Sequence, residues 1–314
     1  MLSPLEVMTP ASRGTRNLAS RSCLAMTKVS VAGRRLDLGY KLITALNLGF
    51  KFAYSRVRDK PVTNIGWPLS DCLARVRIFD VEYRFHLRKD SDHNIYMNPF
   101  FHEFDVSNFV HSVLKPGDVF VDVGAYAGSY TLAAAKIVGP KGKVVSIEPN
   151  PETLAYLKEN VSLNRLENVT VVNKAAGQAN GKVTLYYDPS TAVLSSLDRK
   201  SSQRRPMWFS LGRRASSPRW VETQLTTLDE LYLEHVYPRE IDIVKIDTEG
   251  QDLQVLLGGQ RALSRTRYVV VEQNTEAERR LLSRQGFGIS DLTPSGYLLA
   301  TRTHPPSSPR QIVY

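Results

Sequence analysis

The feature that most constrains the fold is the stretch Val119–Thr131, which reads V-F-V-D-V-G-A-Y-A-G-S-Y-T. Its first five residues are β-branched or aromatic apart from one Asp, a composition typical of a strand buried on both faces. Gly124 and Gly128 predict a tight turn after this strand, and Ser129–Val138 is rich in Ala, Leu and Ile at helical spacing. The N-terminus of that helix leaves backbone N–H groups at the end of the strand, so the stretch predicts a small-ligand site.

An acidic residue at the end of the next strand indicates a nucleoside. Lys143–Ile147 is the second predicted strand, and Glu148 follows it directly, twenty residues after Gly128. At this place an acidic side chain can accept hydrogen bonds from both hydroxyls of a ribose. Strand, glycine turn, helix, strand and acid together predict a nucleoside-containing cofactor.

The glycine spacing distinguishes between cofactors. A dinucleotide site uses G-x-G-x-x-G, because its second and third glycines let backbone and helix approach a pyrophosphate. Here Tyr126 stands two residues after Gly124, where its bulk obstructs a pyrophosphate but can wall an amino-acid carboxylate. S-adenosylmethionine is therefore favoured over NAD. The alternative to a cofactor site is a glycine turn that only joins a strand to a helix. It is disfavoured because Glu148 is followed by Pro149–Pro151.

The net charge of +10 lies in appended segments of the chain. Residues 1–60 hold eleven Lys and Arg against three acidic residues, and residues 198–220 hold seven against one. The rest of the 314 residues, enough for one α/β core of roughly 200–250 residues, is net acidic. Nucleic acid or an anionic membrane surface is one kind of partner for the basic segments, but a solvated or disordered tail is the interpretation we favour.

The cysteine content and the N-terminal composition bear on location. Cys23 and Cys72 are too few for a zinc site or a disulfide framework, so we expect a reducing, cytoplasmic compartment. Residues 1–35 are basic and lack apolar periodicity, which predicts disorder. Their Ser, Ala and Arg bias fits either an organelle transit peptide or an over-extended start ahead of Met26.

No transmembrane segment is expected, because the apolar stretch Leu36–Tyr54 is interrupted by Lys41 and Lys51 and falls short of the roughly 20 residues of a membrane span. This stretch is predicted to be a helix that packs on the core, the alternative being a helix on a membrane surface.

The other predicted elements complete an α/β fold. They are a hairpin at Ala74–Phe79 and Glu82–Leu87, a helix at Phe104–Leu114, a helix from Pro151, strands at Val169–Asn173, Lys182–Tyr187, Ile241–Ile246 and Tyr268–Val271, and a hairpin at Phe287–Leu292 and Tyr297–Thr301. This order predicts a doubly wound, Rossmann-like sheet of seven strands that ends in a C-terminal antiparallel hairpin. Glu103 precedes one helix, where we expect a solvated acid; the alternative is a contact with the cofactor edge.

Carboxylates follow two of the buried strands. Asp247 and Glu249 come after Ile241–Ile246, and Glu272 comes after Tyr268–Val271. The carboxyl ends of parallel strands face the ligand crevice, so we expect the three side chains to converge there. They can serve as a general base or as metal ligands, whereas the alternative for Asp247 is a helix N-cap.

The strand order also predicts what faces Asp247. It reverses between the first and fourth strands, so Ile241–Ile246 is expected to lie beside Val119–Val123. Asp247 then lies across the crevice from Gly124.

Several ordered motifs carry a family resemblance. They are V-D-V-G-A-Y-A-G-S-Y-T at Val121–Thr131, E-P-N-P at Glu148–Pro151, N-V at Asn168–Val169, T-L-D-E-L at Thr227–Leu231 and K-I-D-T-E-G at Lys245–Gly250. From Pro116 to Thr301 the chain resembles the FkbM family of S-adenosylmethionine-dependent methyltransferases. The family usually has Asn at the place of Tyr126 and Val at that of Thr248. The resemblance implies O-methylation of a hydroxyl on a sugar or secondary metabolite, without naming the acceptor.

The resemblance and the pattern together nominate the site residues. The cofactor-binding candidates are Asp122, Gly124, Tyr126, Gly128, Glu148, Asn150 and Ala175. The small residues from Ala175 to Gly177 either let an adenine ring lie against the backbone or mark a close helix–strand contact. For the proton of a hydroxyl acceptor, Asp247 is the first choice of base and Glu249 the second, with Glu272 as an orienting group. We expect no resident metal; if one assists, Glu272 is its third ligand.

The predicted domain organisation places one catalytic domain after two N-terminal segments. Residues 1–35 form the basic segment, 36–115 a helical and β-rich segment, 116–302 the methyltransferase domain and 303–314 a tail. Residues 188–220 form an insertion without periodicity, interpreted as a lid or a substrate-selecting element, with surface disorder as the alternative.

Two other classes of function compete with a methyltransferase acting on a small-molecule or glycan acceptor. A nucleic-acid-binding module, or an RNA methyltransferase, would use the basic segments. Among the arginines of residues 199–219, however, the aromatic residues are only Trp208, Phe209 and the adjoining Trp220, fewer than a stacking surface needs. The third class is a cofactor-binding protein without catalysis. The oligomeric state is left open.

Overall fold

The apolar strand β4 (Val119–Val123) lies at the centre of a seven-stranded sheet in the computed structural model. The structure describes residues 27–32, 72–78, 81–87, 103–187, 195, 197, 219–292 and 295–302. β4 pairs in parallel with β5 (Lys143–Ile147) on one side and with β10 (Ile241–Ile246) on the other. All five residues of β4 are buried, as expected for a strand covered on both faces.

The sheet order confirms the predicted topology. The strands follow one another as β12-β13-β11-β10-β4-β5-β6, with β6 at Val169–Val172 and β11 at Thr266–Val271. β13 (Leu298–Arg302) is antiparallel to β11, and β12 (Phe287–Asp291) is antiparallel to β13. The doubly wound Rossmann-like sheet with a C-terminal antiparallel hairpin is therefore observed, and so is the predicted neighbourhood of β4 and β10.

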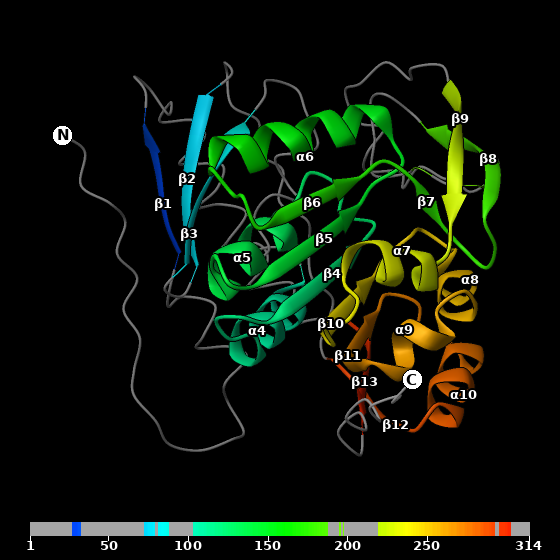
Figure 1. Ribbon diagram of the computed structural model, residues 1–314. Coiled ribbons are helices and arrows are strands. Elements are labelled where there is room, and N and C mark those ends of the chain that lie inside the picture. The colour runs from blue at the N-terminus through cyan, green and yellow to red at the C-terminus, as the bar shows by residue number, and fades with distance from the viewer. Residues whose placement is uncertain are drawn as a thin grey trace, which may run out of the picture.

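Helices cover both faces of this sheet (Figure 1). They are α4 (Phe104–Val113), α5 (Ser129–Val138), α6 (Pro151–Leu163), α7 (Leu228–His235), α8 (Asp252–Leu257), α9 (Gln260–Ser264) and α10 (Glu276–Arg284). Because successive side chains of a strand point to opposite faces, β4 contributes to two cores. Phe120 belongs to the core that includes residues of α4 and α5, whereas Val121 belongs to the core that includes residues of α7, α8, α9 and α10.

A smaller sheet lies beside the large one and contains a strand that the sequence did not predict. Its order is β7-β9-β8, with β7 at Ala175–Ala176, β8 at Gly181–Tyr187 and β9 at Arg219–Thr226. The assignment of Arg219 and Trp220 to an irregular insertion is wrong, because both belong to β9. The buried positions of β9 are Thr223 and Thr226, so its apolar pattern is weak and its pairing with β8 defines it.

An N-terminal antiparallel sheet of three strands precedes the central fold. β2 (Cys72–Ile78) and β3 (Val81–Leu87) form the predicted hairpin, and β1 (Thr27–Ala32) pairs along the outer edge of β2. The prediction of disorder for residues 1–35 is therefore wrong at Thr27–Ala32. Pairing with β2 supplies the backbone hydrogen bonds that a six-residue strand lacks on its own.

β3 attaches this small sheet to the helices of the central fold. The Arg84 amide donates to Oδ1 of Asn164 at 2.8 Å, and Nδ2 of Asn164 donates to the Arg84 carbonyl at 2.6 Å. Phe85, the next residue, is buried. The hairpin thus packs against the central fold.

Some predictions fall outside the described residues. These are the helix at Leu36–Tyr54, nearly all of the insertion at 188–220, and the tail at 303–314. Among the helices that the structure does describe, none has the length and apolar character needed to cross a membrane.

Candidate functional site

The glycine turn after β4 is pressed against the end of β10. The amides of Gly124 and Ala125 both donate to the carbonyl of Ile147, each at 3.0 Å, which holds the turn on β5. Gly124 has a φ of +79°, and a Cβ atom placed there would lie 1.8 Å from the carbonyl oxygen of Asp247. A residue with a side chain does not fit at this position. The absence of a side chain at Gly124 therefore lets the turn contact Asp247, the residue that we nominate as base.

The second glycine of the turn begins α5. Gly128 is the N-cap residue, with a φ of +95°, and a Cβ there would approach Cδ1 of Leu157 to 2.6 Å. It has no side chain with which to cap the helix, so the first amides of α5 are left without a side-chain cap. Such amides suit an anionic group of a ligand.

Tyr126 occupies a strained backbone position between the two glycines. Its φ is +53°, a left-handed conformation that Asn adopts more readily than bulky residues do. This explains why Asn is usual at this position in the family that the chain resembles. The amide of Tyr126 donates to Oε2 of Glu148 at 2.8 Å, so the turn is fastened to the acid that follows β5.

Glu148, the acid nominated for the ribose, is a buried carboxylate. Its Oε1 accepts a hydrogen bond from the Asn150 amide at 2.9 Å, so each oxygen has one backbone donor. The Thr153 side chain also hydrogen-bonds this carboxyl. Burial raises the pKa of Glu148 to about 7, although the Asn150 amide acts in the opposite direction. A cofactor that donates hydroxyl hydrogens to both oxygens would favour the ionised form.

The structure places Asp122 inside the fold. Its side chain is fully buried, and its Oδ2 accepts a hydrogen bond from Thr131 at 2.7 Å. The Thr131 hydroxyl is also 2.7 Å from that of Ser146, and Oδ1 of Asp122 lies 3.9 Å from Nζ of Lys245. Oδ1 itself accepts no hydrogen bond from the described residues. The side chain of Asp122 is thus enclosed within the protein.

Asn150 and Ala175 are also buried. Oδ1 of Asn150 caps α6 by accepting from the Glu152 amide at 2.9 Å, and its Nδ2 donates to Ser195 at 2.7 Å. Ala175 is paired with Leu225 of β9. Of the seven cofactor candidates, four therefore lie in the turn or at the end of β5, and the other three lie in the supporting structure.

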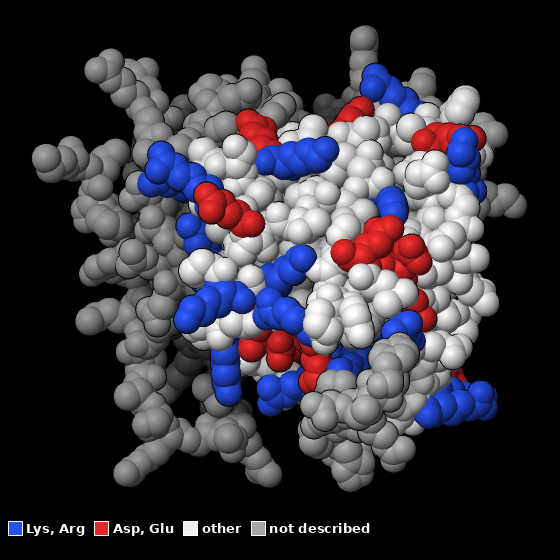
Figure 2. Space-filling model, viewed as in Figure 1, with Lys and Arg blue, Asp and Glu red and all other residues white. Residues whose placement is uncertain are grey.

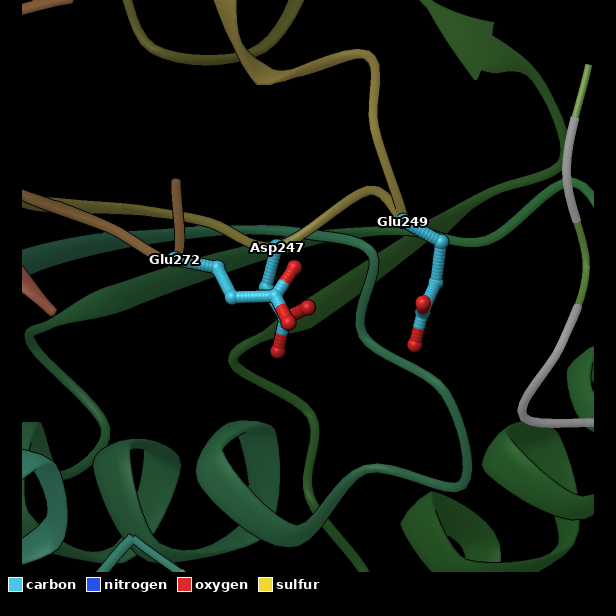
Figure 3. Close-up of side chains that lie close together, drawn as sticks. All are labelled: Asp247, Glu249 and Glu272. Carbon is cyan, nitrogen blue, oxygen red and sulfur yellow. The ribbon is translucent and has the colours of Figure 1, made fainter. Parts of the chain in front are cut away.

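Three carboxylates gather at the ends of β10 and β11, as predicted (Figure 3). Asp247 and Glu272 lie close together at the ends of these two strands, and the Glu249 side chain lies beside them. One carboxylate oxygen from each lies within 4.8 Å of the others, and all three residues are partly buried. Oxygen atoms at this spacing can share a divalent cation such as Mg²⁺.

Asp247 is not a helix cap. α8 begins at Asp252 with Gln251 as its N-cap residue, which excludes the alternative of an N-cap at Asp247. Asp252 fastens the intervening loop by accepting from the Thr248 amide and the Gln273 amide, both at 2.9 Å. Asp247 is held instead by Nζ of Lys245, which is 2.9 Å from its Oδ2.

Repulsion among these acids favours one retained proton. The pKa of Glu272 is raised well above its ordinary range by burial first, and then by the charges of Asp247, Glu249 and Asp252. Burial likewise raises the pKa of Asp252 to about 6. This rise in pKa favours the protonated form of Glu272, which can donate a hydrogen bond to Asp247. The expectation of no resident metal stays a prediction.

Four further residues form a polar cluster behind Asp247 that the sequence did not reveal. Nζ of the buried Lys245 is 4.9 Å from the ring centroid of Tyr130. The hydroxyls of Tyr130 and Tyr297 donate to the two oxygens of Glu103, at 2.8 and 2.7 Å. The prediction of a solvated acid at Glu103 is wrong, because these two hydroxyls bind it. The one signal available was a lysine within the apolar run of β10.

Comparison with known proteins identifies the family. The model of the Methyltransferase FkbM domain matches residues 122–288, just over half of the chain. The chain belongs to the FkbM methyltransferase family. It is accordingly an enzyme of the methyltransferase class, as the resemblance in the sequence implied.

Relatives of this FkbM methyltransferase include 2-O-methyltransferase NoeI of Sinorhizobium fredii, 27% identical over 195 residues, which cover 59% of this chain and 75% of that protein. Hexuronic acid methyltransferase AglP of Haloferax volcanii is 27% identical over 170 residues, which cover 54% and 62%. A solved structure of methyltransferase FkbM from Methylobacillus flagellatus KT aligns with a TM-score of 0.38 at 17% identity, covering 66% of this chain and 53% of that one.

Proposed function

We propose that this FkbM methyltransferase transfers a methyl group from S-adenosylmethionine to a hydroxyl group of a sugar or secondary metabolite. The observation that carries the proposal is the contact between the two halves of the site. The carbonyl of Asp247 lies so close to Gly124 that no side chain fits between them. Asp247, the proposed base for the acceptor, is therefore in direct contact with the glycine turn proposed to bind the cofactor.

The residues around the turn suit the parts of this cofactor. Glu148 offers two carboxylate oxygens to the ribose hydroxyls, and the uncapped start of α5 offers amides to the amino-acid carboxylate. Tyr126 stands where a dinucleotide site has its second glycine, so its side chain is expected to obstruct a pyrophosphate. When bound, S-adenosylmethionine supplies an electrophilic methyl group on a positively charged sulfur.

Asp247 is proposed to accept the proton of the acceptor hydroxyl. Its Oδ2 accepts from Lys245 at 2.9 Å, and Oδ1 is the oxygen proposed to accept the proton of the acceptor hydroxyl. Burial alone would lower the pKa of Lys245, but Asp247, Asp122 and Glu103 together raise it, so the ammonium stays charged and keeps Asp247 paired. Glu272, protonated, orients the carboxylate of Asp247, and Glu249 borders the space beside it. A partly buried site of this kind limits water around the reacting atoms.

The substrate class rests on the relatives. The names of NoeI and AglP describe a 2-O-methyltransferase and a hexuronic acid methyltransferase, so both names are consistent with a sugar hydroxyl as acceptor. We extend this class to the present chain. The scarcity of cysteine supports a reducing, cytoplasmic setting for the reaction.

Calorimetric titration of the purified protein with S-adenosylmethionine and with NAD tests the cofactor. We expect binding of the former and none, or much weaker binding, of the latter. Tighter binding of NAD would overturn the proposal.

Transfer of a labelled methyl group, screened over sugar, lipid, peptide and RNA fractions, then tests the acceptor. Label in the sugar fraction supports the proposed class, and label confined to RNA contradicts it. Cofactor binding without transfer to any fraction would favour the class of cofactor-binding proteins without catalysis.

A further inference from the structure

The polar cluster behind Asp247 contains residues from outside the FkbM domain. The family match ends at residue 288, and Tyr297 follows it in the segment that leads into β13. Glu103 precedes the match and stands directly before α4. Neither residue belongs to a motif that identified the site. Their convergence on Asp247 therefore calls for an explanation from the geometry.

The contacts of Tyr297 are those of a buried, well-held hydroxyl. Its side chain is 4% exposed. Its oxygen lies 3.2 Å from Oδ2 of Asp247 and 2.7 Å from Oε1 of Glu103. Nζ of Lys245 approaches the same Oδ2 at 2.9 Å. Two donor groups from different elements therefore meet one oxygen of the Asp247 carboxylate.

We propose that Tyr297 is a positioning residue for Asp247: its hydroxyl, held by Glu103, fixes Oδ2 together with Lys245 and so presents Oδ1 to the acceptor. The inference rests on the proposed role of Asp247 as base. Without Tyr297 the carboxylate keeps Lys245 but gains freedom to rotate about its Cβ–Cγ bond. Since effective general base catalysis needs the accepting oxygen within hydrogen-bond reach of the proton, such rotation lowers turnover.

Glu103 keeps the tyrosine hydroxyl in place. A phenol has one hydrogen to donate, so Asp247 and Glu103 share the same donor, and the shorter distance lies on the side of Glu103. Its other oxygen is occupied by Tyr130 at 2.8 Å. Glu103 is thus fixed at both oxygens and defines where the hydroxyl of Tyr297 lies.

The backbone around these two residues is fastened as well. The amide of Ser295 donates to Oδ2 of Asp105 at 3.0 Å, and its hydroxyl donates to the same oxygen at 2.5 Å. The amide of Leu292 donates to the carbonyl of Tyr297 at 2.8 Å, which closes the turn between β12 and β13. The first turn of α4 and this hairpin turn are therefore connected, so Glu103 and Tyr297 are held in register.

A double-mutant cycle between Tyr297→Phe and Asp247→Asn tests the inference. Phenylalanine keeps the ring in the core and removes only the hydroxyl. We expect Tyr297→Phe to lower kcat about tenfold, in the range of one hydrogen bond to a charged group, with the dissociation constant of S-adenosylmethionine unchanged. In the Asp247→Asn background the same substitution should cause no further fall, because the carboxylate that it positions is already gone.

Matched variants separate positioning from folding. Tyr268→Phe removes a hydroxyl from β11 outside the cluster and should leave kcat and Tm unchanged. Glu103→Gln keeps the shape beside Tyr297 and should lower kcat in the same direction, again without effect in the Asp247→Asn background. If Tyr297→Phe fails to fold, Glu103→Gln provides the test in its place.

The outcomes distinguish the inference from the function on which it rests. The positioning role is overturned if Tyr297→Phe has full activity, or if it lowers kcat equally in the wild-type and Asp247→Asn backgrounds. In either case, inactivity of Asp247→Asn still supports Asp247 as the base. Full activity of Asp247→Asn overturns the base itself and the inference with it.

Discussion

At the scale of single residues, Glu148 couples the site to pH. Its pKa of about 7 in the folded chain lies above the ordinary value of 4.5, because the carboxyl is buried. The protonated form is thus preferred on folding. The stability it contributes is complete below pH 4.5 and is lost as the pH rises toward 7.

Cofactor affinity should change with pH in the opposite sense. If the ribose hydroxyls bind the ionised carboxylate of Glu148, the affinity for S-adenosylmethionine should rise roughly tenfold between pH 6 and pH 8. Calorimetry at the two pH values measures this difference. Glu148→Gln is the control, since it binds more weakly and should show a flat profile. An affinity of the wild-type protein that is equal at both values would remove Glu148 from the ribose contact.

Gly124 shows how one residue joins the two halves of the site. Gly124→Ala would place a methyl group against the Asp247 carbonyl in addition to the left-handed strain, so we expect a loss of roughly 3 kcal/mol or more in the free energy of unfolding. Gly117→Ala is the matched control: its φ is +97°, but nothing lies within 4 Å of the added methyl group. We expect it to cost only about 1–2 kcal/mol. Chemical denaturation of both variants measures the two losses, and equal losses would show that the contact with Asp247 is unimportant.

The site residues that could be predicted from the sequence are those that directly follow a strongly apolar strand. Gly124, Glu148 and Asp247 each follow a strand of strong apolar pattern, and the topology of parallel sheets brings such positions together. Sequence reasoning failed for Lys245 and Tyr297. From the sequence, Lys245 only interrupts an apolar strand, because its pairing with Asp122 appears only in the register of β10 and β4. No residue near Tyr297 in the sequence indicates its contact with a carboxylate fifty residues earlier in the chain.

At the scale of elements, the pairing of β4 with β10 creates the site. Asp122 and Lys245 are register partners on these strands, and both point to the face that α5 covers. The two turns that follow the strands then meet at Gly124 and Asp247. Strong periodicity made these strands predictable. β9 was missed because its buried positions are threonines, so partner pairing, which is a non-local property, decides its structure.

At the scale of the whole molecule, a side chain of the loop after α6 hydrogen-bonds the N-terminal sheet to the central fold. Asn164 bonds both backbone groups of Arg84 in β3, and it also donates to the carbonyl of Asn160 at 2.8 Å. Asn164→Ala removes these bonds and should lower the free energy of unfolding by roughly 1–3 kcal/mol, while turnover below the Tm stays unchanged. Thermal and denaturant unfolding measure the loss.

Asn164→Asp is the control for this attachment. It keeps the acceptor for the Arg84 amide and removes the donor, so it should show an intermediate loss. A Tm of the alanine variant equal to that of the wild-type protein would mean that β3 is held by other contacts.

The face of the molecule shown in Figure 2 gives little support to a nucleic-acid partner. Figure 2 shows Lys and Arg interspersed with Asp and Glu on the face in view, without an extended patch of one sign. Phosphate-backbone binding depends on several cations acting together and weakens steeply with salt. The basic segments of the sequence lie largely outside the described residues. A methyltransferase acting on a small molecule or glycan remains the function that the site supports best.

The central claim is that Asp247 takes the proton of the acceptor beside the cofactor turn. Asp247→Asn keeps the size and hydrogen-bonding shape of the side chain and removes the base. Turnover of this variant, measured together with its calorimetric affinity for S-adenosylmethionine, tests the claim most directly. We predict a fall in turnover of roughly 10²–10⁴ with the affinity nearly unchanged. Full turnover would contradict the account, and a joint loss of affinity would make Asp247 a cofactor ligand instead of the base.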